Sequence, residues 1–118
     1  MFSSVVKTAF WLIVAVMLGT VTVDVVLNRH AQRLQRLIAR EARARKFDPD
    51  RVAEMVGRLS GSDPAFAVNG RYGLMALTTN DAAAWAAKTG NKFETFDLFD
   101  PQTNLRIGLW KLAQEESR

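Results

Sequence analysis

The residues of this chain that could do chemistry are few, and they gather in three short segments. There is no Cys, so disulfides and thiolate ligands are excluded, and the single His30 has no second His or Cys to complete a zinc site. We therefore expect no metal and no cofactor, and any catalysis would depend on carboxylates that transfer protons. The three segments read Leu59-Ser60, Tyr72-Gly73-Leu74-Met75-Ala76 and Phe99-Asp100-Pro101, the last followed by Asn104 and Gly108.

In order and spacing, these segments resemble the soluble lytic transglycosylases, which cleave the glycan strands of peptidoglycan. Family members have a helix that starts near Asp-Pro, a Glu-Ser pair, a Phe-x-Pro-like turn, a Gly-Leu-Met-Gln signature, a Leu-Phe-Asp-Pro segment and an Asn-containing helix. No single piece is specific, but their order is. The matching residues, between Phe47 and about Leu112, are Phe47-Asp48-Pro49-Asp50, Leu59-Ser60, Asp63-Pro64, Gly73-Leu74-Met75-Ala76, Leu98-Phe99-Asp100-Pro101, Asn104 and Gly108.

The departures from the family pattern all remove chemistry. Glycosidic cleavage needs a carboxylic acid to protonate the leaving oxygen, and Leu59 stands where the family has that Glu. Glu54 lies five residues earlier, about 140° around a helix from Leu59, and is not expected to substitute. The sugar-contacting Gln of the signature is Ala76. The sequence ends at Arg118, before the family's later Ala-Tyr-Asn-like segment, so we expect only about half of the groove.

What remains of the family's groove signature has a structural alternative. Gly73, Leu74 and Met75 could instead be structural residues at the start of a helix. Gly73 would let two chain segments approach closely, and Leu74 and Met75 would fill the core. For Trp85 and Trp110, packing in the core or at an interface competes with a sugar platform. The residual groove candidates are Ser60, Tyr72, Gly73 and Met75.

The N-terminal segment has the length and composition of a membrane anchor. Residues 8–27 are apolar apart from Asp24 and span about 30 Å as a helix, which matches a hydrocarbon core. Trp11 suits an interfacial position, and Ala15 with Gly19 would let another helix approach. Asp24 would lie at the headgroup level or contact a partner helix. We predict an anchor over residues 1–28; a cleaved secretory signal is the alternative.

A basic segment follows over residues 29–46, with seven Arg or Lys and one acid. Its composition favours helix, with Leu34, Leu37, Ile38 and Glu41 or Ala42 on one side. It is either a solvated stalk or a helix held against anionic headgroups or an acidic partner. Lacking aromatic residues for base stacking, it does not suggest nucleic-acid binding. The expected basic surface comprises Arg29, Arg33, Arg36, Arg40 and Arg43.

Two features of the sequence give opposite predictions for the membrane orientation. The positive-inside rule places the segment that follows the anchor in the cytoplasm, whereas the family resemblance places it in the periplasm, where peptidoglycan lies. We expect a single-pass inner-membrane protein with a periplasmic C-terminal part.

Residues 47–118 read as helix after helix, with no alternating strand pattern. The Asp-Pro pairs at 48–49 and 100–101 each predict the start of a helix, and Thr79 or Asn80 is expected to cap a third helix. Gly61 and Gly90 are expected to end two of these helices. The last helix is expected to fray over residues 114–118. The fold class is therefore all-α: an anchor, a basic helix and a small partial lysozyme-like domain.

Three functions are compatible with this pattern. The first, which we favour, is a non-catalytic subunit of a larger membrane complex, because a core of about seventy residues without disulfides is marginal and gains from a partner. The second is a peptidoglycan-binding module without lytic activity. The third is a glycan lyase that uses an unexpected acid. The expected partners are membrane lipid and other membrane subunits.

Overall fold

The computed structural model describes residues 29–117, which fall into two units. Of the first unit, Met1–Leu34, only residues 29–34 are described, and they are helical. The second unit, Gln35–Arg118, holds the globular part. No helix within the described residues is both long and apolar enough to cross a membrane. The predicted anchor lies outside the described residues, with Trp11, Ala15, Gly19 and Asp24.

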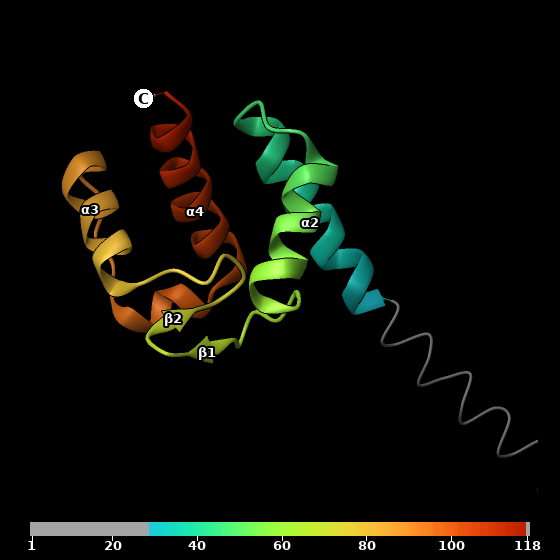
Figure 1. Ribbon diagram of the computed structural model, residues 1–118, viewed down its shortest axis with the longest axis horizontal. Coiled ribbons are helices and arrows are strands. Elements are labelled where there is room, and N and C mark those ends of the chain that lie inside the picture. The colour runs from blue at the N-terminus through green and yellow to red at the C-terminus, as the bar shows by residue number, and fades with distance from the viewer. Residues whose placement is uncertain (1–28, 118) are drawn as a thin grey trace, which may run out of the picture. The chain divides into compact units, whose positions relative to one another are not determined.

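The described chain is mainly helical, as predicted, and Figure 1 shows the small hairpin at one end of α2, α3 and α4. Within the described residues, the first helical stretch is 29–44, and it ends two residues before the end of the predicted basic segment; we call it the first helix. The remaining elements are α2 (Pro49–Ser60), β1 (Ala67–Val68), β2 (Arg71–Tyr72), α3 (Thr79–Thr89), the 3₁₀ helix η1 (Thr95–Phe99) and α4 (Pro101–Glu116).

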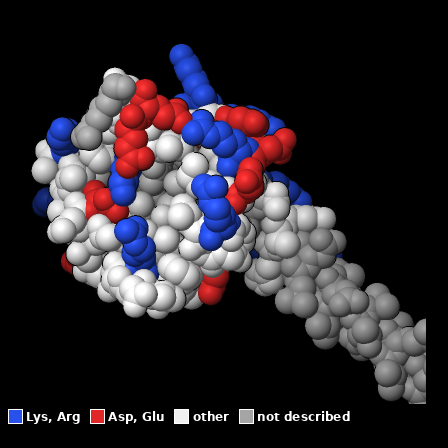
Figure 2. All heavy atoms as spheres, in the orientation of Figure 1, with Lys and Arg blue, Asp and Glu red and all other residues white. Residues whose placement is uncertain are grey.

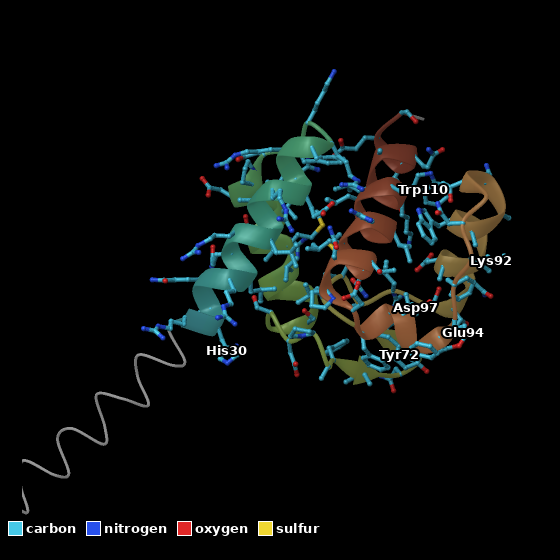
Figure 3. The ribbon with its side chains drawn as sticks, turned by 180° about the vertical axis from the view of Figure 1, so that it is seen from behind. His30, Tyr72, Lys92, Glu94, Asp97 and Trp110 are labelled. Carbon is cyan, nitrogen blue, oxygen red and sulfur yellow. The ribbon has the colours of Figure 1, made fainter. Side chains whose placement is uncertain are left out.

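A tight reversal joins the first helix to α2, and residues 35–44 of that helix lie beside α2 in Figures 1 and 3. Lys46 adopts a left-handed conformation (φ 62°), and the Phe47 amide donates to the Ala42 carbonyl at 2.9 Å. Asp48 then caps α2 by accepting from the Asp50 amide. The side of the first helix predicted to be apolar is the packed one, since Ile38 and Ala42 are buried.

Most helix boundaries follow the predicted capping residues. Asp48-Pro49 starts α2 and Asp100-Pro101 starts α4, while Gly61 and Gly90 end α2 and α3 in left-handed conformations. The predicted cap of α3, Thr79 or Asn80, was wrong, because the cap is Thr78. Thr78 and Asp81 form a capping box, in which the side chain of each accepts a hydrogen bond from the backbone amide of the other. The predicted fraying after residue 113 was also wrong, since α4 continues to Glu116.

The all-α prediction missed a short antiparallel hairpin. Ala67 pairs with Tyr72 and Val68 with Arg71, across a turn in which Asn69 and Gly70 both have positive φ. The hairpin was not predicted, because strands of two residues are too short to produce an alternating pattern.

The segment after the hairpin, residues 73–77, is the buried floor of the domain. It was expected to begin a helix, but it forms turns, and each of its five residues is buried. Backbone that is buried outside regular structure needs other partners for its N–H and C=O groups. Local pairs satisfy several: Gly73 N donates to Phe66 O at 2.8 Å, Ala76 N to Gly73 O at 3.0 Å and Leu77 N to Tyr72 O at 3.0 Å.

Two buried side chains satisfy further groups of this floor. Asn104, fully buried in α4, accepts from Met75 N at 2.7 Å and donates to Tyr72 O at 2.9 Å and Leu98 O at 2.8 Å. Ser60, at the end of α2, donates to Leu74 O at 2.8 Å. These side chains therefore tie the floor to both of the helices beside it.

Two glycines provide the space that this arrangement needs. A Cβ on Gly73 would lie 2.1 Å from Asn104 Nδ2 and 2.2 Å from Leu98 O. A Cβ on Gly108 would lie 2.6 Å from Met75 Cγ. The floor and α4 consequently fit together only where both positions lack a side chain.

Gly73 and Gly70 form a matched pair for testing this fit, because both have φ +74° and only Gly73 is crowded. We expect Gly70→Ala to lower the free energy of unfolding by about 1–2 kcal/mol through backbone strain alone. Gly73→Ala should cost about 3 kcal/mol or more, because its Cβ meets a backbone carbonyl that cannot move away easily. Thermal unfolding of the full chain in mild detergent, followed by circular dichroism, measures both. Equal losses would show that the floor tolerates a side chain.

Candidate functional site

A groove lies between α2 and α4, and Leu59, the residue at the expected position of the general acid, is part of its lining. It encloses about 140 Å³, and Leu59 is in its wall with 38% of its surface exposed. On the face shown in Figure 2, uncharged side chains fill the space between these helices, and charged side chains of both signs border it. The lining comprises Met55, Leu59, Arg71, Met75, Ala76, Leu77, Gly108, Lys111, Leu112 and Glu115.

The four residual groove residues do not act together at this surface. Met75 reaches the groove and forms part of its floor, with 6% of its surface exposed. Ser60 and Gly73 are buried and do not line the groove. Ser60 donates to Leu74 O, and Gly73 leaves the space that the side chain of Asn104 fills. Tyr72 packs edge-on against Phe99, with ring centroids 5.7 Å apart, and also lies outside the lining. Three of the four therefore support the floor or the hairpin.

Among residues 29–117, no sheltered acid lines this groove. Glu54 is exposed and does not line it, as its helical position predicted. The one carboxylate in the lining is Glu115, which is 57% exposed and lies 4.0 Å from Lys111. This is the setting of a surface ion pair and not of a general acid held over a substrate.

The groove's rim is connected to α3 through Lys111. Its ammonium lies 3.1 Å from Asp81, whose side chain is 17% exposed. Burial alone would raise the pKa of Asp81, but hydrogen bonds from Thr78 and the charge of Lys111 outweigh burial and hold that pKa below its usual value. Asp81 therefore remains an ionised helix cap and ion-pair partner.

Neither Trp85 nor Trp110 enters the core. Trp110 is half-buried and lines a hollow of about 230 Å³ between α3 and α4, where Figure 3 shows it. Trp85 is half-buried in a larger hollow on another part of the surface. Both positions fit packing at helix junctions, and neither tryptophan is near Leu59 in the groove lining.

The larger hollow lies between the end of the first helix, the end of α3 and the start of α4, and it encloses about 580 Å³. All of its lining belongs to the second unit. The residues are mostly polar or basic: Arg40, Glu41, Ala44, Arg45, Trp85, Asn91, Gln102, Thr103 and Arg106.

Glu41 organises this hollow. Its side chain is 5% exposed, and its carboxylate accepts from Arg45 at 2.5 Å and from Gln102 at 3.0 Å, with Arg106 at 3.6 Å. Burial raises the pKa of Glu41, but the hydrogen bonds from Gln102 and Arg45 and the charges of both arginines outweigh it and leave the pKa lowered. A carboxylate from the first helix thus joins that helix to α4.

Sequence reasoning placed Glu41 on the packed side of the basic helix but assigned it no partner. The signal was a single acid among seven basic residues, at an otherwise apolar position. Its partners Gln102 and Arg106 are about sixty residues away, and no local pattern connects them.

The expected basic surface is solvent-facing wherever the structure describes it. Arg29, Arg33, Arg36, Arg40 and Arg43 are all exposed. Within residues 29–117, no group of His, Asp or Glu side chains is arranged to hold a metal ion.

Comparison with known proteins adds no relative: no family model, no curated protein and no solved structure matches this chain. Its function has to be argued from its own residues.

Replacing the buried carboxylate tests the connection between the first helix and α4. We expect Glu41→Gln to lower the free energy of unfolding at pH 7 by about 1–3 kcal/mol, because charged hydrogen bonds are lost and two arginines lose their partner. The exposed Glu54→Gln should have little effect.

The pH dependence of this loss has a definite sign. Because the folded-state pKa of Glu41 is lowered, its stabilisation is present above about pH 4.5 and is lost as pH falls through the folded-state value. Thermal melts of the wild type and Glu41→Gln should therefore differ most near pH 7 and converge in acid. A difference that is independent of pH would contradict the role assigned to the charge.

Proposed function

We propose that this chain is a membrane-anchored, non-catalytic relative of the soluble lytic transglycosylases and serves as a structural or accessory subunit of a larger membrane complex. In this proposal, residues 1–28 span the inner membrane and continue into the basic helix. Residues 47–118 form a partial lysozyme-like domain on the periplasmic side.

The proposal rests on one observation: the residues that match the family pattern support the buried floor, whereas the positions expected to do chemistry lack reactive side chains. Ser60, Gly73, Asn104 and Gly108 hold the buried floor in place. The positions that would do chemistry carry Leu59 and Ala76, which line the groove without a proton donor or an amide. A fold that keeps its internal supports and lacks its reactive groups suits a protein used for its shape.

The groove does not favour glycan binding as the main function. At about 140 Å³ it falls below the roughly 300–1,000 Å³ of typical ligand sites, and much of its lining is aliphatic. We therefore treat peptidoglycan binding as the alternative function, which sedimentation of the chain with purified sacculi would support.

The lack of catalysis is tested on purified sacculi. We expect the full-length chain to release no anhydro-muropeptides, because no sheltered carboxylic acid faces the groove. Leu59→Glu should also be inactive, since an acid alone supplies neither the signature amide, replaced by Ala76, nor room for a sugar. An active lytic transglycosylase serves as the positive control. Products released by either form would contradict the proposal, and sedimentation with sacculi would favour the binding module.

The subunit role is tested by purification from membranes. We expect the full-length chain, extracted in mild detergent, to elute from gel filtration with at least one other membrane protein in a fixed ratio. An unrelated single-pass protein with the same tag, purified in parallel, controls for detergent-driven association. A monodisperse monomer that retains no partner at any detergent concentration would count against the proposal.

A further inference from the structure

The hollow around Glu41 has the size and charge of a ligand site. Its volume of about 580 Å³ lies within the usual range for small-molecule sites. Arg40, Arg45 and Arg106 contribute three positive charges to the lining and Glu41 one negative charge. The hollow therefore carries a net charge of about +2.

The single carboxylate is already occupied by the protein. Glu41 Oε2 faces Arg45 at 2.5 Å and Arg106 at 3.6 Å, while Oε1 accepts from Gln102 at 3.0 Å. Each guanidinium has five N–H groups in a fixed fork, so Arg45 and Arg106 keep donors that Glu41 does not use. The buried carboxylate therefore positions two arginines for another acceptor.

Arg40 adds a third cation that is not engaged elsewhere in the described part of the chain. It lies next to Glu41 in the first helix, is exposed, and forms no ion pair with any residue described. Trp85 supplies an aromatic surface in the same lining, and Asn91 supplies an amide. The hollow thus combines free cationic donors with a flat apolar surface.

We propose that this hollow binds a phosphomonoester, with the phosphate held by Arg40, Arg45 and Arg106 and the attached organic group placed against Trp85. A phosphomonoester carries a charge of about −1.5 to −2 near neutral pH, which balances the lining. Its oxygens match the paired donors of guanidinium groups. A monovalent carboxylate would leave about one positive charge uncompensated. The site is independent of the lack of catalysis proposed for the groove between α2 and α4, because none of its lining residues belongs to that groove.

The test uses the full-length chain in a maltoside detergent, which carries no phosphate. Calorimetric titration with glycerol 3-phosphate is compared with chloride at matched ionic strength. The same chain in nanodiscs is compared between phosphatidic acid and phosphatidylglycerol, a monoester and a diester headgroup. Binding of glycerol 3-phosphate supports a soluble ligand, and binding of phosphatidic acid alone supports a lipid headgroup. Binding of neither above its control would overturn the proposal.

Two arginines of the first helix provide the matched variants. Arg40 lines the hollow, whereas Arg43 is equally exposed and does not. We expect Arg40→Ala to weaken phosphomonoester binding about tenfold, the usual effect of losing one charged hydrogen bond, and Arg43→Ala to leave it nearly unchanged. Both side chains are exposed, so both variants should keep the wild-type circular dichroism spectrum. Equal weakening by the two variants would show general charge attraction and would overturn the site.

Discussion

The structure depends on satisfying one stretch of buried, irregular backbone. Residues 73–77 pass through the middle of the domain without helix or strand geometry, so their polar groups need partners from elsewhere. Asn104 supplies three hydrogen bonds around this stretch and Ser60 supplies another. The alternative, an unsatisfied buried amide or carbonyl, costs about 1–3 kcal/mol for each group, which is a large part of the stability of a small domain. The helices α2 and α4 are placed where these side chains can reach.

If the proposed family relationship holds, this constraint accounts for which residues of the family pattern are kept. Gly73 and Gly108 have to lack side chains for Asn104 and Met75 to fit. The side chains of Leu59 and Ala76 make none of the floor's hydrogen bonds. These are the two positions at which the residues of the catalytic pattern are missing. A chain can therefore lose reactive groups and keep its fold, provided that the supports of the buried floor remain. The family assignment is our interpretation of this division.

Local signals in the sequence predicted local structure well. Asp-Pro pairs and glycines located helix ends because capping depends on a few neighbouring residues. The hairpin was missed because two-residue strands show no periodicity. The roles of Asn104 and Glu41 were missed for another reason: their partners lie 29 and 61 residues away, and one sequence does not reveal such pairs. Leu59 lines a groove, but the burial of Ser60 and of Gly73, away from that groove, was not predicted.

The long reach of these contacts has a consequence for synthesis on the ribosome. The floor at residues 73–77 is made before α4, yet Met75 N finds its acceptor only in Asn104. Glu41 can pair with Arg45 as soon as the first helix is made, but its contacts with Gln102 and Arg106 of α4 form only later. A nascent chain that has exposed only α2 and the hairpin therefore lacks its stabilising contacts and remains a target for chaperones and proteases until α4 has left the exit tunnel.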